Sequence, residues 1–342
     1  MKKFIKQIIA LSCFWIYKVI SKGKLIIITY HRILPKGKLK NMIIQPGMYV
    51  EKETFKKHIQ FLKKNYRILS FPEYLQSTKN RLLRADERYC IITFDDGWRD
   101  NYKYAFPIVK KYSVPAMIFL PVSFIGTNKW FLEDRVAYIL GKCKDQKKVF
   151  NASLSKEFRF LVKKFFDSSF IEKKREVFDK IIKYIKRLRQ KDRLLIVDKM
   201  QELCDVILPE KQLFLSWDEV KEMSENGIIF GSHGMNHKIL TEIPSDEIEH
   251  EVKESHLALL NKNINYFPIF CYPGGYYNKE IIKIVSKSGY KMAVTTRFGY
   301  SKIYKETYFK MPRILVHQDI SVNKYLFSLH LSGIVQFLKF KK

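Results

Sequence analysis

Short, β-branched apolar runs alternate with longer stretches of helical period along most of this chain. Strand candidates of this kind occupy residues 25–29, 91–94, 116–120, 228–230, 269–272, 293–295 and 314–316, with helical periods between them, as at 54–64 and 104–112. This alternation is typical of parallel βαβ units. Because the chain has no glycine-rich nucleotide-binding turn, the pattern favours an α/β barrel over an open sheet.

The apolar run at 91–94 stops abruptly at two adjacent carboxylates, Asp95 and Asp96, followed by Gly97. Two acids at the end of a buried strand are costly unless a cation meets them. After the run at 228–230, the segment Ser232-His233-Gly234-Met235-Asn236-His237 supplies two imidazoles. One carboxylate and two imidazoles form a common ligand set for a catalytic divalent metal, and the second carboxylate is then available as a base. These residues predict a metal-assisted hydrolase.

Each motif has a plainer interpretation when it stands alone. An Asp-Asp-Gly sequence is common in turns, and a His-x3-His pair is usually two surface or core histidines. The combination is more informative, because Tyr272-Pro273-Gly274-Gly275 and His317 also come directly after strand candidates. Barrel enzymes carry their active sites on the face where the carboxyl ends of the strands meet. We therefore expect these residues to converge on one site.

Composition limits the classes to which the chain can belong. Its 342 residues, 46% of them hydrophobic, suffice for a sizeable core and exclude a disordered chain. Lys and Arg number 63 against 34 Asp and Glu, a formal net charge of +29, which suits an acidic polymer or an anionic membrane surface. Nucleic acid is disfavoured, because zinc-finger spacings, aromatic ribonucleoprotein motifs and basic-region heptads are all missing. The five scattered cysteines argue against a disulfide framework and for a reducing compartment.

Both ends of the chain are basic and partly apolar, with no acidic residue before Glu51 or after Asp319. Residues 1–24 look like a signal peptide but lack a small-residue cleavage pattern, and their apolar run is too short to span a bilayer. The segment fits either a helix in the interface of an anionic leaflet or a basic helix packed on the domain, and the tail at 321–342 allows the same two interpretations. We expect a cytoplasmic enzyme peripheral to the inner face of the cell membrane. The alternative is an exported protein anchored by an uncleaved N-terminus.

The regular alternation breaks between about residues 130 and 212. This segment has mainly helical period and carries 21 Lys or Arg against 13 Asp or Glu. We interpret it as a helical insertion in one loop of a barrel that spans residues 25–320. Two roles are open for it: a lid or platform for an acidic or membrane-held substrate, and a solvated structural excursion.

The motifs resemble those of the polysaccharide deacetylase family, metal-dependent carbohydrate esterases that remove N-acetyl groups from chitin-like and peptidoglycan-like glycans. The most specific matches are the segments 93–97 and 231–240, and the similarity runs from about Ile26 to Val316, broken by the insertion. The resemblance implies a distorted (β/α) barrel with fewer than eight regular units. Tyr30-His31 fits the branch of the family that includes biofilm-polysaccharide deacetylases. His31 itself is expected to be a structural histidine rather than one that faces the pocket.

The resemblance also implies roles for individual residues. A metal-activated water would attack the amide carbonyl, a carboxylate would take the water proton, and a histidine would protonate the departing amine, without a covalent intermediate. A backbone N–H in the turn after the strand candidate at 269–272 would meet the oxyanion. The implied metal ligands are Asp96, His233 and His237, the base is Asp95, the acid is His317, and the oxyanion and substrate turn is Tyr272, Pro273, Gly274 and Gly275.

The chain departs from the family pattern in two places. The third motif, usually Arg-Pro-Pro-Tyr-Gly, appears as Cys271-Tyr272-Pro273-Gly274-Gly275, and the fourth, commonly an acid followed by a tryptophan, is not evident near Thr295-Thr296-Arg297. Cys271 stands where the family usually has an arginine, so the group that orients the base carboxylate has to come from elsewhere. Arg313, at the start of the last strand candidate, is the first choice for that group. Arg32 is the second.

The expected function is a metal-dependent N-deacetylase of an amino-sugar polysaccharide or a lipid-linked glycan precursor in cell-surface polysaccharide assembly. One divalent ion is expected; zinc is the default, and nickel, cobalt or iron would tolerate the same ligands. Hydrolysis of another non-peptide C–N bond is an alternative within enzymes. A catalytically silent glycan-binding homologue is a second, although binding alone does not need all four of Asp95, Asp96, His233 and His237. A membrane scaffold would explain the charge but not the motifs, and the sequence leaves the oligomeric state open.

Overall fold

The computed structural model describes residues 16–151, 154–304 and 308–334. The chain divides into two compact units. We call the first the barrel unit; it comprises the chain up to Leu34, Tyr49–Thr127 and the chain from Phe214 onward. We call the second the helical unit; it comprises Pro35–Met48 and Asn128–Leu213.

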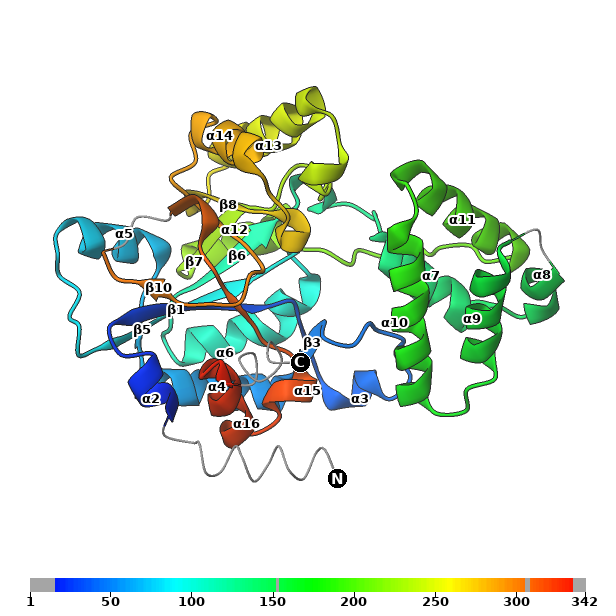
Figure 1. The fold of residues 1–342 in the computed structure, drawn as a ribbon, viewed down its shortest axis with the longest axis horizontal. Coiled ribbons are helices and arrows are strands. Elements are labelled where there is room, and N and C mark those ends of the chain that lie inside the picture. The colour runs from blue at the N-terminus through cyan, green and yellow to red at the C-terminus, as the bar shows by residue number, and fades with distance from the viewer. Residues whose placement is uncertain (1–15, 152–153, 305–307, 335–342) are drawn as a thin grey trace. The chain divides into compact units, whose positions relative to one another are not determined.

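The barrel unit is built on a curled, mainly parallel sheet (Figure 1). Its strands are rich in β-branched residues and almost wholly buried, as expected where both faces of a parallel sheet are covered. In sheet order they are β10 (Ser301–Lys302), β1 (Lys24–Tyr30), β5 (Arg88–Phe94), β6 (Ala116–Leu120), β7 (Ile228–Ser232), β8 (Tyr266–Cys271) and β9 (Met292–Val294), with β4 (Arg67–Ile68) beside β5 and β11 (Ile314–Leu315) beside β1.

The sheet closes on itself through the segment that leads into β11. Met311 bridges to Val294 of β9, and three residues later Ile314 pairs with Ile28 of β1 in parallel register. Backbone bonds from Thr295 N–H to the Met311 carbonyl and from Val316 N–H to the Thr29 carbonyl complete this seam. The prediction of a distorted barrel is therefore confirmed.

Alternate residues along the strands fill the barrel interior. Ile27, Ile91 and Phe119 belong to one buried cluster that also takes in residues of β8 and β9. A side chain at Gly231 of β7 would have no room, because its Cβ would lie 2.8 Å from the Phe119 ring. The packing inside the barrel therefore depends on glycine at this position.

Helices surround the sheet of the barrel unit (Figure 1). Two of them, α5 and α12, begin with a complete capping box, from Ser70 to Glu73 and from Ser216 to Glu219. The helix predicted at 104–112 begins as a π-helical turn over Asn101–Ala105 before it continues as α6. The α-helices are α2 (Ile16–Ile20), α4 (Lys52–Asn65), α5 (Phe71–Lys79), α6 (Phe106–Lys111), α12 (Trp217–Glu225), α13 (Ser245–Leu260), α14 (Lys279–Lys287), α15 (Gln318–Ser321) and α16 (Lys324–Leu331).

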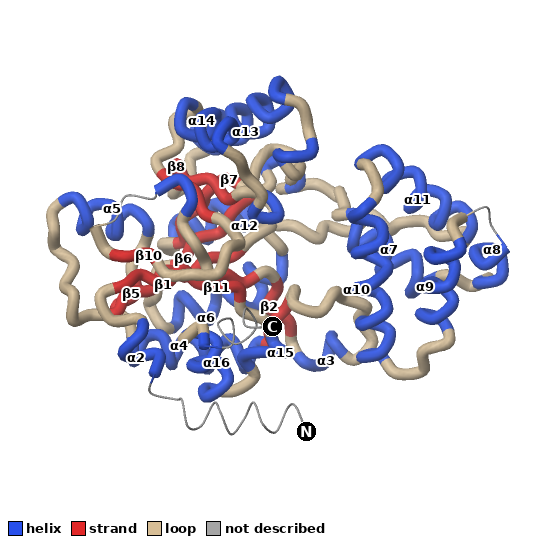
Figure 2. The backbone as a smooth tube through the Cα atoms, viewed as in Figure 1, coloured by secondary structure: helices blue, strands red, loops and turns tan. Residues whose placement is uncertain are grey.

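The helical unit has its own apolar core, drawn from the inward faces of its longer helices. The buried Arg175 donates to the carbonyls of Leu39 and Met42 and so joins the segment Pro35–Met48 to these helices, although the sequence analysis assigned that segment to the barrel. Figure 2 shows helices and loops throughout the described part of this unit. They are α3 (Lys36–Leu39), α7 (Leu132–Lys142), α8 (Gln146–Asn151), α9 (Lys156–Phe166), α10 (Ile171–Arg187) and α11 (Gln190–Leu203).

Among the residues that the structure describes, no helix is both long and apolar enough to cross a membrane. Most of the predicted basic N-terminal segment, residues 1–15, and the end of the tail, residues 335–342, lie outside the described residues.

Candidate active site

The residues singled out in the sequence follow neighbouring parallel strands at the same edge of the barrel. Asp95 and Asp96 follow β5, His233 follows β7, Cys271 ends β8, and His317 comes two residues after β11. Because the carboxyl ends of parallel strands share one face, the motifs come together in space although they lie far apart in the chain.

Asp96, His233 and His237 form the first of two groups of ligand atoms at this edge. Asp96 Oδ1 lies 3.4 Å from Nε2 of His233 and 3.4 Å from Nε2 of His237. In a tetrahedral site with bonds of about 2.1 Å, neighbouring ligand atoms lie about 3.4 Å apart. The donor set and its spacing therefore fit a single divalent ion, with a further coordination position left for water or substrate.

Backbone conformation turns two of these ligands toward the shared position. Asp96 and His237 are non-glycine residues with φ of 73° and 58°, in the left-handed region. Such a conformation costs roughly 1–3 kcal/mol and concentrates at functional sites. At Asp96 it reverses the direction of the chain after Asp95, so that the two adjacent carboxylates meet different partners.

Hydrogen bonds to protein groups fix the other ends of two ligands. Trp98 Nε1–H donates to Asp96 Oδ2 at 3.0 Å, which leaves Oδ1 facing the imidazoles. His233 Nδ1 lies 2.7 Å from the Cys271 carbonyl; since a carbonyl only accepts, Nδ1 donates to it, and Nε2 is the nitrogen that faces Asp96 and would bind a metal. Burial opposes ionisation of Asp96, but the hydrogen bonds from both imidazoles outweigh it and hold the pKa of Asp96 well below its usual value.

A buried acid on α13 holds the loop that carries the histidines. Glu251 Oε2 accepts from the backbone N–H of Asn236 at 2.7 Å, and its Oε1 accepts from the Asn236 side chain at 2.6 Å. Ser123 donates to the same Asn236 side chain from the segment after β6. The sequence analysis missed Glu251 and Trp98. The signal for Glu251 was available, because an acid stands there on the otherwise apolar and small-residue face of α13.

Asp95 lies in a different environment, clamped by an arginine. Arg313 Nη1 and Nη2 lie 2.7 Å from Asp95 Oδ1 and Oδ2, a bidentate pair in which both side chains are buried. Burial raises the pKa of Asp95, but the guanidinium charge and its hydrogen bonds outweigh burial, and the pKa lies below its usual value. Asp95 is therefore an ionised carboxylate near neutral pH.

The guanidinium itself is held on every side. Arg313 also donates to the Thr295 carbonyl at 2.8 Å, to Thr29 Oγ1 at 3.1 Å and to Cys271 Sγ at 3.2 Å. Arg313, from the seam of the barrel, thus takes the place of the arginine that the third motif lacks. The small thiol of Cys271 leaves room for it. Arg32, the second candidate, pairs instead with Asp100 at 2.8 Å, and its guanidinium lies 4.2 Å from the Trp98 ring.

Asp95, His233 and Cys271 form a second group with ligand spacing. The Arg313 guanidinium already occupies both oxygens of Asp95 and contacts the thiol. Burial raises the pKa of Cys271, which keeps the thiol protonated. A cation beside a guanidinium and a neutral thiol is disfavoured, so Asp96 and the two imidazoles are the better metal site.

Two histidines lie near the polar edge without belonging to the metal group. His31 Nε2 lies 4.0 Å from Asp95 Oδ2, and its buried Nδ1 has no hydrogen-bond partner among the described residues. The expectation of a satisfied structural histidine is therefore wrong for that atom. His317 Nδ1 lies 3.2 Å from Asp319 Oδ2, at the start of α15.

The turn Tyr272–Gly275 follows β8 and lies against the histidine loop, since a Cβ on Gly234 would come within 3.9 Å of Pro273. The N–H groups of Tyr272 and Gly275 already donate to the Val294 and Tyr272 carbonyls. Proline has no N–H, which leaves the exposed Gly274 as the candidate oxyanion donor of the four. Gly274 has a φ of 65°, in the left-handed region. A Cβ at Gly275 would lie 1.9 Å from Thr296 Oγ1. Both positions therefore favour glycine.

A comparison with known protein families identifies the family of this chain. The family model described as polysaccharide deacetylase matches residues 83–151 and 161–293, more than half of the chain. The chain belongs to the polysaccharide deacetylase family. The resemblance inferred from the motifs is confirmed, and the match extends through both the carboxylate and the histidine segments.

Individual relatives agree with this family. The chain is 25% identical over 287 residues to the Bacillus subtilis protein named "Putative polysaccharide deacetylase YxkH", covering 83% of this chain and 68% of that protein. It is 29% identical over 117 residues to the poly-beta-1,6-N-acetyl-D-glucosamine N-deacetylase of Staphylococcus epidermidis, covering 32% of this chain and 40% of that one. The fold is similar to that of the Streptococcus pyogenes deacetylase PplD in complex with acetate, with a TM-score of 0.55 and 20% identity over 89% of this chain and 97% of that one.

Proposed function

We propose that this polysaccharide deacetylase is a metal-dependent N-deacetylase that removes N-acetyl groups from an amino-sugar polysaccharide or a lipid-linked glycan precursor. One observation carries the proposal: two adjacent buried carboxylates have separate partners, a guanidinium for Asp95 and two imidazoles for Asp96. A glycan-binding protein has no need of this separation. A hydrolase needs both a base and a metal ligand.

Asp96, His233 and His237 would hold the ion. A divalent metal bound there polarises the amide carbonyl and lowers the pKa of bound water. Zinc is the first choice for one carboxylate and two imidazoles, and nickel, cobalt and iron suit the same ligands. Trp98 and the Cys271 carbonyl orient two of these ligands before any ion binds.

Asp95 is the proposed base that accepts the proton of the attacking water. Arg313 keeps this carboxylate ionised and fixes its orientation, because each oxygen accepts one guanidinium hydrogen bond. Each oxygen retains a lone pair that can accept the proton of the water. The developing oxyanion would lie near the N–H of Gly274, in the turn beside the histidine loop.

The amine leaves only when it is protonated, and two histidines compete for that role. His317 is the proton donor that the family motif implies. His31 lies beside the proposed base, with 4.0 Å between its Nε2 and Asp95 Oδ2. Turnover of His31→Gln and His317→Gln assigns the donor, because loss of a general acid lowers turnover by about 10²- to 10⁴-fold.

Two relatives support the substrate class. The Staphylococcus epidermidis relative is named for poly-beta-1,6-N-acetyl-D-glucosamine, and the Streptococcus pyogenes neighbour was solved with acetate, which is the product expected from an N-acetyl group. The net charge of +29 further supports association with an anionic membrane surface. We place the protein at the cytoplasmic face of the cell membrane, with export and an uncleaved N-terminal anchor as the alternative.

The deciding experiment measures acetate release from N-acetylglucosamine oligomers by the purified chain loaded with zinc, nickel, cobalt or iron. The controls are chelated protein and His233→Ala, with Asp86→Asn as a matched change at an exposed carboxylate. Release that requires metal and disappears in His233→Ala supports the proposal. Bound metal without release points to another amide or to a lipid-linked substrate, and neither metal nor release favours the silent glycan-binding homologue.

A further inference from the structure

A groove of about 610 Å³ lies in the barrel unit, away from the residues of the candidate active site. We call it the lysine groove, because Lys18, Lys57, Lys64 and Lys324 line it. They come from three helices of that unit: Lys18 from α2, Lys57 and Lys64 from α4, and Lys324 from the start of α16. α16 contacts both α2 and α4, so the three form one surface.

The lining of the lysine groove is strongly basic. None of the ten described residues that line it is acidic; its other polar members are amides and tyrosines. Lys57, Lys64 and Lys324 form no ion pair with any described residue. The four lysines of the lining carry a formal charge of +4, and Lys57, Lys64 and Lys324 have no carboxylate partner among the described residues.

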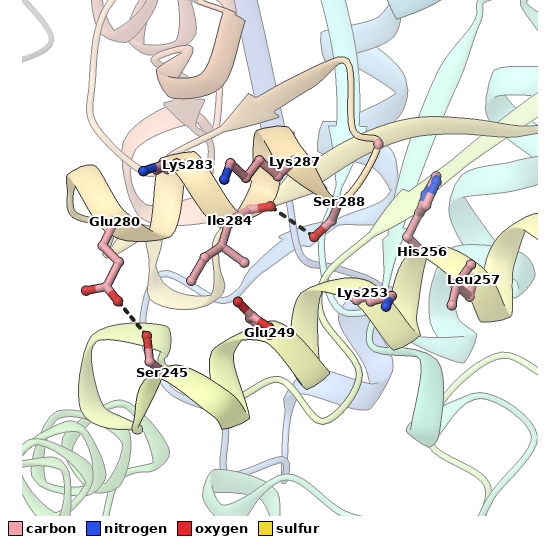
Figure 3. Close-up of a pocket in the computed structure, with 11 residues that line it drawn as sticks. Ser245, Glu249, Lys253, His256, Leu257, Glu280, Lys283, Ile284, Lys287 and Ser288 are labelled. Atoms are coloured by element: carbon pink, nitrogen blue, oxygen red, sulfur yellow. Dashed lines mark hydrogen bonds between the residues drawn. The ribbon is translucent and has the colours of Figure 1, made fainter.

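A second hollow of similar size shows that lysines alone do not create this property. It lies between α13 and α14, measures about 640 Å³, and is lined by Lys253, Lys283 and Lys287 (Figure 3). Glu249 and Glu280 line it too, which brings its formal charge to +1. The lysine groove differs by lacking such acids.

The side chains between the lysines suit a lipid interface. On α4, Lys57, Phe61 and Lys64 share one stripe, opposite a face that is buried in the unit. Phe61 packs against Tyr17 with ring centroids 5.2 Å apart, and Lys324 lies 4.9 Å from the Tyr325 ring. Aromatic rings beside lysines are typical of surfaces at the headgroup level of a membrane.

Two exposed apolar residues lie close in the chain to lysines of the groove. Val19, next to Lys18, is 77% exposed, and Val322, two residues before Lys324, is 42% exposed. Exposed apolar side chains near lysines are suited to the boundary between headgroups and acyl chains.

We propose that the lysine groove is the surface by which this protein docks on a membrane, with the phosphates of anionic lipid headgroups in the groove. The proposal deepens the membrane association proposed above, and it does not depend on the deacetylase chemistry. An anionic lipid surface attracts each nearby lysine by about 1 kcal/mol, so removal of three lysines weakens binding by roughly 100-fold.

The test is co-sedimentation of the full chain with vesicles of phosphatidylglycerol and phosphatidylcholine, and with vesicles of phosphatidylcholine alone. The test variant is K57Q/K64Q/K324Q, and the matched control is K253Q/K283Q/K287Q, which removes the same charge from the other hollow. We expect the wild type and the control to bind the anionic vesicles, the test variant to bind about 100-fold more weakly, and 50 mM inorganic phosphate to leave binding unchanged apart from the effect of its ionic strength.

Three outcomes would overturn the proposal: no binding of the wild type, equal loss in both triple variants, or undiminished binding of the test variant. The last would assign docking to another basic part of the chain. Competition by phosphate beyond a matched chloride control would show a site for a free anion instead of a membrane surface. Acetate release from soluble oligomers should be the same in both variants, so a failed docking test and a failed deacetylase test remain distinguishable.

Discussion

Asp95 and Asp96 are neighbours in the chain, equally buried, and identical in chemistry, yet they have opposite kinds of partner. Asp95 faces a permanent cation, which no proton exchange can neutralise. Asp96 faces the Nε2 atoms of two imidazoles, which are the atoms that would bind a metal. The change of φ to 73° at Asp96 separates the two. One dipeptide thus supplies two sites, a protein-made ion pair and a position for a removable ion.

The contrast between Asp95 and Asp96 is tested most strongly by changing one side chain at each of the two sites. In Asp95→Asn we expect metal to bind as in the wild type while turnover falls by about 10²- to 10⁴-fold, because the amide cannot accept the water proton. In His237→Ala we expect both metal and turnover to be lost. Metal content and acetate release measured on the same preparations check this. Full activity in Asp95→Asn would remove Asp95 from the role of base.

The arginine side of the comparison is tested by Arg313→Met. The buried Asp95 would lose its cation, so its pKa should rise and the acid limb of the pH–rate profile should move to higher pH. Breaking a buried pair from one side typically costs about 3–5 kcal/mol in the free energy of unfolding. Urea unfolding and the pH profile are the measurements.

An exposed pair with the same fork geometry is the control for that change. Arg84 meets both oxygens of Asp86 at 3.0 Å on the surface. Arg84→Met should leave both the unfolding transition and the pH profile unchanged, because solvent screens this pair. Equal effects of the two substitutions would contradict a special role for burial.

The proposed metal site is tested further by Trp98→Phe, which removes the N–H donor to Asp96. In the wild type the Trp98 ring stacks on Phe214 at 4.8 Å, and phenylalanine keeps an aromatic ring in that place. We expect metal affinity to fall by about 10- to 100-fold, with turnover largely restored at saturating metal. Competition with a chelating dye measures the affinity. Trp217→Phe, an indole of the same unit, is the control and should leave the affinity unchanged.

The last prediction concerns a buried imidazole that has no carboxylate partner among the described residues. His58 stacks on Phe327 and lies 2.7 Å from the Ser321 carbonyl through Nε2. Burial lowers its pKa to about 4, with a backbone hydrogen bond opposing and His330 reinforcing the shift. His58 is therefore neutral in the folded protein above that pH.

The sign of the resulting pH dependence follows from this depressed pKa. The unfolded chain binds a proton at His58 below pH 6.5 and the folded chain only below about pH 4. The contribution of neutral His58 to the free energy of unfolding is complete above pH 6.5. It is lost as the pH falls from 6.5 to 4, by at most about 3 kcal/mol. Urea unfolding of chelated His58→Gln should show a shallower loss in that window than wild type. His250→Gln, at an exposed position, should match the wild type.

Local pattern was enough to predict seven of the strands and the residues that end them, but not the short strands at 32–34, 49–51, 67–68 and 301–302. The candidate at 116–120 coincides with β6, and the others differ from the observed strands by a few residues at their ends. Arg313 was a good candidate because a buried carboxylate needs a cation and this arginine starts a strand. Arg32 met the same criterion, but its pairing with Asp100 could not be seen in the sequence.

Contacts across long stretches of chain explain what the sequence analysis missed. Glu251 reaches the histidine loop from α13, and the unpaired Nδ1 of His31 depends on what surrounds it, so neither follows from spacing in the chain. Trp98 is only two residues from Asp96, yet its role depends on the left-handed turn between them. A turn of that kind is not encoded by residue type alone.

The seam that closes the barrel has a consequence for how the protein is made. Arg313 lies between Met311, which bridges to β9, and Ile314, which pairs with β1, so the partner of Asp95 arrives with the last strand. During synthesis, Asp95, Asp96, His233 and His237 all leave the ribosome well before residue 313 does. Until then the barrel is open and Asp95 has no guanidinium. The proposed metal ligands are therefore synthesised before the partner of the proposed base, and the candidate site is complete only with the final tenth of the chain.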